Sequence, residues 1–152
     1  MAITMFITKF HPKVCSHIPD RSLIPDRTIE QIREAGVKVG ISIKPATPVN
    51  DISHMLRDVD MVLIMTVQPG FGGQKYMEEC TEKIREVREL IDAEDLDVDV
   101  QVDGGINDET METVLTAGAN LLVAGSYVFR GDLEKNVKHA RRRMDEIIRR
   151  ID

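Results

Sequence analysis

Apolar positions along this chain follow two alternating spacings. Short apolar or every-other-residue runs, typical of strands, occupy residues 2–10, 37–43, 61–65, 98–103 and 120–124. Apolar residues three or four positions apart, typical of amphipathic helices, follow each later run. Strands that alternate with helices predict a parallel α/β sheet. We therefore expect one domain over residues 1–152 with about five strands.

The predicted helices have recognisable starts and ends. The first covers residues 26–35, with Asp26 as a cap, Gly36 beyond its end, and Ile29, Ile32 and Ala35 on one face. The second starts at Thr47-Pro48, because proline is favoured at the first helical position. Its buried stripe comprises Val49, Ile52, Met55, Leu56 and Val59. The third carries Met77, Cys80, Ile84, Val87 and Ile91. Asn107 caps the fourth, which ends near Gly118, and Gly131-Asp132 opens the last, whose apolar face comprises Leu133, Val137, Ala140, Met144, Ile147 and Ile148.

A glycine-rich loop follows the third predicted strand. It reads Met65-Thr66-Val67-Gln68-Pro69-Gly70-Phe71-Gly72-Gly73-Gln74. Glycine lets the backbone adopt positive φ and approach a ligand closely. Inward-pointing N–H groups, followed by a helix N-terminus, suit an anion such as phosphate. The loop pattern alone is equally typical of a tight strand-to-helix connection.

A second candidate site lies at the end of the fourth predicted strand. Valines alternate with polar residues over residues 98–103, so Asp103 lies on the face opposite Val100 and Val102. Gly104 and Gly105 follow directly. Parallel α/β folds place their chemistry at the carboxyl ends of strands. Asp103 is therefore a candidate functional residue, with the start of a simple turn as its alternative interpretation.

Composition narrows the function classes. The net charge of −6 and the absence of a large basic patch argue against nucleic-acid binding. No apolar run approaches the length of about 20 residues that spans a membrane. Cys15 and Cys80 form no disulfide framework or metal motif, so we expect reduced thiols in a cytoplasmic protein. The N-terminal part contains two histidines: His11 lies at the end of the first predicted strand, and we expect His17 to be a solvated loop residue.

The two candidate stretches together resemble the ribulose-phosphate 3-epimerase family, over residues of about 30 to 130. The resemblance rests on Lys38-Val39-Gly40-Ile41-Ser42-Ile43-Lys44-Pro45, on residues 65–74 and 102–106, on Ala117-Gly118-Ala119-Asn120, and on Gly125-Ser126. The family fold is an eight-stranded TIM barrel. The resemblance implies that this chain supplies strands 4 to 8, as a partial barrel of about five strands.

The resemblance also implies a reaction and a set of site residues. The family interconverts D-ribulose 5-phosphate and D-xylulose 5-phosphate by removing and returning a proton at carbon 3. Asp103 matches the strand-7 aspartate, which is both an acid/base group and a ligand of a divalent metal (Zn, Fe, Mn or Co). Met65 matches a residue that lines the site. The phosphate-binding residues would be Gly70, Phe71, Gly72, Gly73, Gly104, Gly105, Gly125 and Ser126.

Part of the family pattern has no counterpart here. The strand-1 serine, the strand-2 segment with its metal histidine and second aspartate, and the strand-3 histidine are not matched. We expect weak metal binding by this chain, and pairing into a homo-oligomer that covers the open sheet edges. The chain could be a fragment, a shortened gene product or a half-barrel completed by another copy. A non-catalytic sugar-phosphate-binding or partner subunit, or an epimerase for a related ketose phosphate, are the alternatives to an epimerase.

Overall fold

The described part of the chain is a parallel sheet with helices on its flank. The computed structural model describes residues 24–151. Its elements are α1 (Ile24–Glu34), β1 (Gly40–Ile43), η1 (Val49–Asp51), η2 (Ser53–Asp58), β2 (Met61–Met65), α2 (Cys80–Ala93), β3 (Asp99–Asp103), α3 (Asp108–Thr116), β4 (Leu121–Val123), α4 (Gly125–Val128) and α5 (Leu133–Ile151). The predicted strand over residues 2–10 lies outside the described residues, as do His11, Cys15 and His17.

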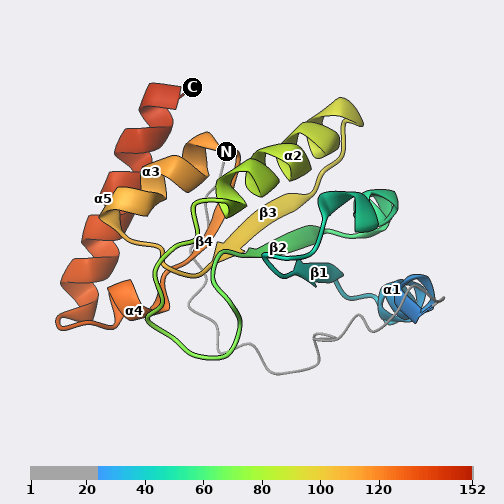
Figure 1. Ribbon diagram of the computed structural model, residues 1–152, viewed down its shortest axis with the longest axis horizontal. Helices are drawn as coiled ribbons and strands as arrows, with labels where there is room; N and C mark the ends of the chain where they lie inside the picture. The colour runs from blue at the N-terminus through green and yellow to red at the C-terminus, as the bar shows by residue number, and fades with distance from the viewer. Residues whose placement is uncertain (1–23, 152) are drawn as a thin grey trace.

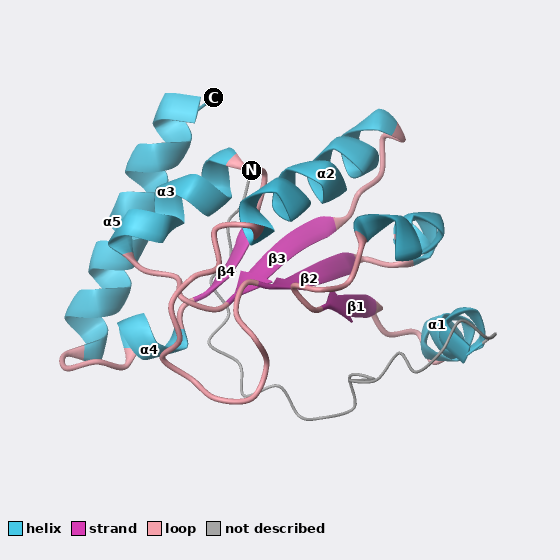
Figure 2. Cartoon of the chain, in the orientation of Figure 1, coloured by secondary structure: helices cyan, strands magenta, loops and turns pink. Residues whose placement is uncertain are grey.

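The four strands are parallel and adjacent in chain order, β1-β2-β3-β4 (Figure 2). Helices α2, α3 and α5 lie together along one side of this sheet (Figure 1). The described strands do not close on one another, which agrees with the predicted partial barrel of βα units. The α/β class and parallel order predicted from the sequence are confirmed.

The core lies between the sheet and the helices. Val62 and Ile64 of β2 are fully buried, and the register sets them beside Val100 and Val102 of β3. Cys80, Ile84, Val87 and Ile91 of α2 are also buried, as predicted for the apolar face of this helix, whereas Met77, assigned to the same face, lies before the helix begins. Aliphatic side chains on both layers form a continuous apolar interior, the usual arrangement for parallel strands under helices.

Two polar side chains complete the amino edge of the sheet. The Val39 N–H donates to Asp60 Oδ2 at 2.7 Å, and the Val100 N–H donates to Asn120 Oδ1 at 2.7 Å. Asn120 Nδ2 in turn donates to Asp99 Oδ1 at 2.7 Å. Backbone groups that begin a strand would otherwise lack partners, so these side chains extend the hydrogen bonding beyond the ladder.

The second predicted helix has a different form from the one expected. Its two pieces, η1 and η2, are 3-10 helices. Val49, Ile52 and Met55 are all buried, as predicted. They recur every three residues, which matches the three residues per turn of a 3-10 helix. The apolar stripe was correct, whereas the inferred α-helical period was wrong.

Several predicted boundaries also need correction. Helix α1 begins at Ile24, so Asp26 lies inside its first turn and is not its cap. Ala35 is exposed and Leu133 is 45% exposed, although both were assigned to apolar faces. Both lie at or beyond a helix end, where the chain turns away from the core. Strand β1 starts only at Gly40, because Val37, at 58% exposure, precedes the paired region.

Candidate functional site

The carboxyl ends of three strands meet at one edge of the sheet. Met65 of β2 pairs in register with Asp103 of β3, and Asp103 pairs with Val123 of β4. The loops that follow cover residues 66–79, 104–107 and 124–132. The structure therefore brings Met65, Asp103 and the three predicted glycine clusters to the same edge of the sheet.

Asp103 is half-buried at this edge. Burial raises the pKa of its carboxyl group, because the charged form loses hydration. A raised carboxyl pKa brings the group closer to neutral pH, where proton transfer in both directions is efficient. The position and electrostatics of Asp103 suit an acid/base group.

Thr66 joins the first two loops, and sequence reasoning did not single it out. It is fully buried, its N–H donates to Asp103 O at 2.9 Å, and its hydroxyl donates to Gly104 O at 2.7 Å. The Met77 N–H donates back to Thr66 O at 2.9 Å. The sequence feature that could have identified Thr66 is its hydroxyl side chain directly after an apolar strand. Thr66 ties the glycine-rich loop to the backbone that carries Asp103.

The glycine-rich loop is closed by one side chain. Gln74 Nε2 donates to Gln68 O at 2.6 Å and to Phe71 O at 2.8 Å. Phe71 is 74% exposed. A Cβ added at Gly70, Gly72 or Gly73 would meet no heavy atom within 4 Å, so these positions border open space. Helix α2 follows this loop, as predicted, but begins only at Cys80, seven residues after Gly73.

Gly104 and Gly105 are packed, in contrast to the first cluster. Both have positive φ, 131° and 68°. A Cβ at Gly104 would lie 2.5 Å from Val67 Cγ2, and one at Gly105 would lie 2.2 Å from the backbone nitrogen of Tyr76. This glycine pair therefore allows the loop after β2 to lie directly against the loop after β3.

The third cluster opens the short helix α4. Ser126 is exposed, and a Cβ at Gly125 would meet no heavy atom within 4 Å. The first backbone bond of this turn runs from the Val128 N–H to Ala124 O. The N–H groups of Gly125 and Ser126 precede that bond, as at every helix start.

The described donor set does not fit a divalent metal. Within residues 24–151, no group of three or more His, Cys, Asp or Glu side chains is arranged to hold one. Asp103 alone offers one carboxylate, whereas metal sites in proteins require several ligands of defined geometry.

Cys80 and the charged face of α5 have structural explanations. The Cys80 thiol is buried and contacts Met65 O at 3.7 Å, and burial raises its pKa, so it is an inert core group.

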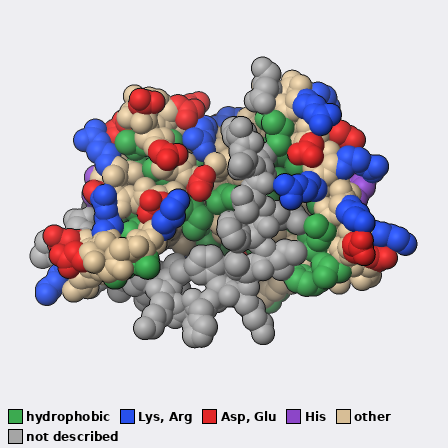
Figure 3. All heavy atoms as spheres, turned by 180° about the vertical axis from the view of Figure 1, so that it is seen from behind, with side chains coloured by type: hydrophobic (Ala, Val, Ile, Leu, Met, Phe, Trp, Pro, Cys, Tyr) green, Lys and Arg blue, Asp and Glu red, His purple; other side chains and the backbone are tan. Residues whose placement is uncertain are grey.

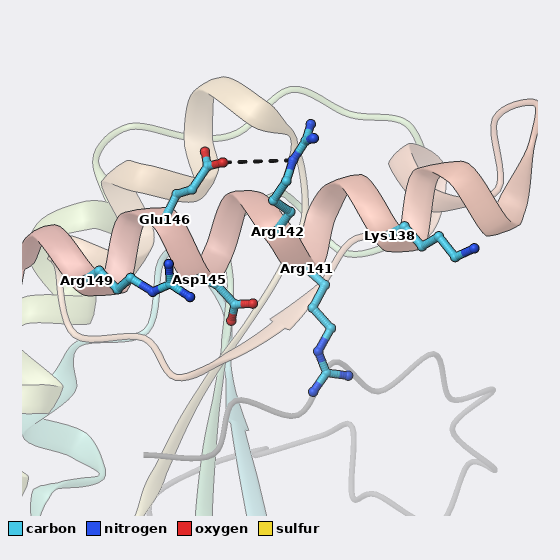
Figure 4. A pocket seen from close by; sticks show the side chains of 6 residues that line it. All are labelled: Lys138, Arg141, Arg142, Asp145, Glu146 and Arg149. Atoms are coloured by element: carbon cyan, nitrogen blue, oxygen red, sulfur yellow. Dashed lines mark ion pairs between the residues drawn. The ribbon is translucent and has the colours of Figure 1, made fainter.

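A groove of about 520 Å³ runs along α5 (Figure 4), and Arg142 Nε and Glu146 Oε1 lie 3.9 Å apart there. Its lining residues are Lys138, Arg141, Arg142, Asp145, Glu146 and Arg149. Both signs of charge are interspersed, here and on the face seen from behind in Figure 3, as on a solvated surface.

No helix within residues 24–151 combines the length and apolar character required to cross a membrane.

Comparison with known proteins gives a consistent result. The model of the ribulose-phosphate 3 epimerase family matches residues 2–129. The ribulose-phosphate 3-epimerase of Bacillus subtilis (strain 168) is 44% identical over 137 residues, which cover 89% of this chain and 60% of the relative. That of Escherichia coli (strain K12) is 38% identical over 123 residues, 81% of this chain and 52% of the relative. That of Mycobacterium bovis is 45% identical over 108 residues, 71% of this chain and 47% of the relative.

The chain thus spans about half to three-fifths of the length of the curated relatives it matches. The family match covers β1 to β4, the loops after β1, β2 and β3, and helix α4, and so includes Asp103 and all three glycine clusters. The chain belongs to the ribulose-phosphate 3-epimerase family.

Proposed function

We propose that this chain contributes to the interconversion of D-ribulose 5-phosphate and D-xylulose 5-phosphate, with Asp103 as one acid/base group. The observation that carries the proposal is the half-buried carboxyl of Asp103 at the carboxyl edge of the sheet, with its raised pKa. Family membership supplies the reaction class.

The chemistry follows from the substrate. The hydrogen on carbon 3 lies next to the ketone at carbon 2, so its removal gives an enediolate. The Asp103 carboxylate would accept that proton and, as the acid, return it to the same face. Return from the opposite face inverts the centre and requires a second acid there. Within residues 24–151, Asp103 is our only candidate for this chemistry.

We assign the phosphate of the pentulose to the three glycine clusters. Gly70, Gly72, Gly73 and Gly125 border open space, which supports close approach of a ligand to their backbone N–H groups. Ser126 offers an exposed hydroxyl beside them. In this proposal, Gly104 and Gly105 bind phosphate through their N–H groups while they pack the loop after β2. Met65, beside Asp103 in register, and Phe71 would line the sugar.

Hydrogen exchange at carbon 3 tests the role of Asp103 directly. D-xylulose 5-phosphate is incubated with the chain in D₂O, and proton NMR follows the carbon-3 signal. We expect deuterium to enter with little inversion, because one group serves one face. Asp103→Asn should abolish the exchange, and Asp97→Asn, an exposed aspartate before the same strand, should leave it intact. Exchange that survives Asp103→Asn would show that another group is the base.

A second candidate function is a non-catalytic sugar-phosphate-binding or partner subunit. The donor set around Asp103 favours it, because the described residues do not form a metal site. This function predicts calorimetric binding of D-xylulose 5-phosphate with no exchange at carbon 3.

We also infer a homo-oligomer in the cytoplasm. The bare edges of β1 and β4 among the described strands support the oligomer, and the buried thiol of Cys80 supports the compartment.

A further inference from the structure

A hydrogen bond joins the loops after β3 and β4. Asp108 is the first residue of α3, three positions after Gly105, and Tyr127 directly follows Ser126 in α4. The Tyr127 hydroxyl donates to Asp108 Oδ1 at 2.8 Å. The contact therefore links two glycine clusters that are separate in the sequence.

A third element supports the same carboxylate. His139 Nε2 of α5 lies 3.0 Å from Asp108 Oδ1, and Arg142 Nη2 lies 3.3 Å from His139 Nδ1. Arginine has no acceptor, so Nδ1 accepts from it and Nε2 carries the hydrogen that is donated to Asp108. We refer to Asp108, Tyr127 and His139 as the Asp108 clamp.

Hydrogen bonds connect the first turn of α3 to Gly105. Asn107 caps the helix by accepting from the Glu109 and Thr110 N–H groups at 2.8 and 3.1 Å. Thr110 Oγ1 donates to Gly105 O at 2.9 Å and accepts from the Asn107 N–H at 3.0 Å. A shift of Asp108 would therefore be transmitted to the glycine pair.

The loop after α4 is held from its other end. Asn136 Nδ2 of α5 donates to Val128 O at 3.1 Å and to Arg130 O at 2.6 Å. Tyr127 thus fixes α4 to α3, while Asn136 fixes the following residues to α5. These contacts connect the segment that contains Gly125 and Ser126 to both α3 and α5.

We propose that Asp108 is a positioning residue, which through Tyr127 and His139 fixes the distance between the Gly104-Gly105 and Gly125-Ser126 loops of the phosphate site. The inference rests on the proposed function, because it assigns both loops to one ligand. Backbone N–H groups from two loops bind one anion well only if their separation is held in advance.

The donor in the clamp persists over the physiological pH range. Burial and the acceptor Asp108 raise the pKa of Tyr127 to about 12. The phenol therefore stays protonated at neutral pH, and its hydroxyl keeps donating to the carboxylate.

The test compares two variants that each remove side-chain contacts between α3 and another helix. Tyr127→Phe deletes only the hydroxyl of the clamp. The control is Glu112→Gln, because the ion pairs of Glu112 among the described residues are with Arg143 at 3.2 Å and Arg150 at 3.1 Å, both on α5 and outside the two loops. Calorimetry with D-xylulose 5-phosphate should show about a tenfold weaker affinity for Tyr127→Phe and no change for Glu112→Gln. The tenfold change corresponds to the free energy that one hydrogen bond typically contributes.

Amide hydrogen exchange without ligand separates the clamp from the phosphate assignment. Residues 104–106 and 125–127 should both exchange faster in Tyr127→Phe and remain as in the unmodified chain in Glu112→Gln. Unchanged exchange in Tyr127→Phe, or equal acceleration in both variants, would overturn the clamp. Faster exchange with unchanged affinity would overturn the role of Asp108 in phosphate binding. An unmodified chain that binds no sugar phosphate would instead reject the proposed phosphate site itself.

Discussion

Replacing Gly105 with alanine should destabilise the fold strongly, whereas the same change at Gly72 should not. The two glycines belong to neighbouring candidate phosphate loops and receive the same methyl group. Their surroundings differ. The added Cβ at Gly105 would lie 2.2 Å from Tyr76 N, with φ at +68°, whereas Gly72 has open space and no positive φ.

The magnitude follows from two costs. An L-residue in the left-handed region costs about 1–2 kcal/mol relative to glycine. Forcing a methyl group into a filled site costs about 1–3 kcal/mol, and here the obstacle is backbone, which cannot rotate away. Together they give about 2–5 kcal/mol for Gly105→Ala. For Gly72→Ala we expect a change within about 0.5 kcal/mol, as at other open surface sites.

Urea unfolding followed by circular dichroism measures both variants against the unmodified chain. Gly105→Ala should unfold at a much lower urea concentration, and its melting temperature should fall by roughly 10 °C for a chain of this size. A midpoint equal to that of the unmodified chain would refute the reasoning. It would mean that the loop after β2 does not lie against Gly105 in solution.

Three further outcomes can be measured. The pKa of Asp103 is raised in the folded state, so its protonated form stabilises the fold below the ordinary aspartate pKa of about 3.9, and this contribution is lost as the pH rises through the folded pKa. Asp103→Asn should therefore be more stable than the unmodified chain at pH 7 and equal to it near pH 3. Urea unfolding at the two pH values measures this difference. Asn120→Ala removes the acceptor of the Val100 N–H and should cost about 1–3 kcal/mol in urea unfolding; an unchanged midpoint would mean that water replaces the side chain. Gly72→Val should weaken calorimetric binding of D-xylulose 5-phosphate by blocking close backbone approach, and unchanged affinity would remove that loop from the phosphate site.

The local pattern of the sequence determined the element types and much of their order. The apolar run of residues 61–65 and the alternating run ending at Asp103 correspond to β2 and β3 within one residue. The cap at Asn107 forms with its full reciprocal hydrogen bonds. These features depend on side-chain period and on contacts a few residues apart, so they can be predicted from the sequence. The position of Asp103 at a strand's carboxyl end belongs to the same class.

Contacts between distant segments decided the rest. The glycine spacing did not distinguish open Gly72 from packed Gly105, because the difference lies in Tyr76, a neighbour brought close by the fold. Thr66 became a central link only because β2 and β3 pair in register, which sets its hydroxyl against Gly104.

The Asp108 clamp shows the same limit. Its members Asp108, Tyr127 and His139 come from three helices and have no spacing that a pattern could detect. The burial that raises the pKa of Asp103 is likewise a property of the folded structure. Local periodicity indicates which side of a helix or strand faces the core. Hydrogen-bond partners and desolvation depend on which other elements pack against that side, and only the tertiary structure determines those neighbours.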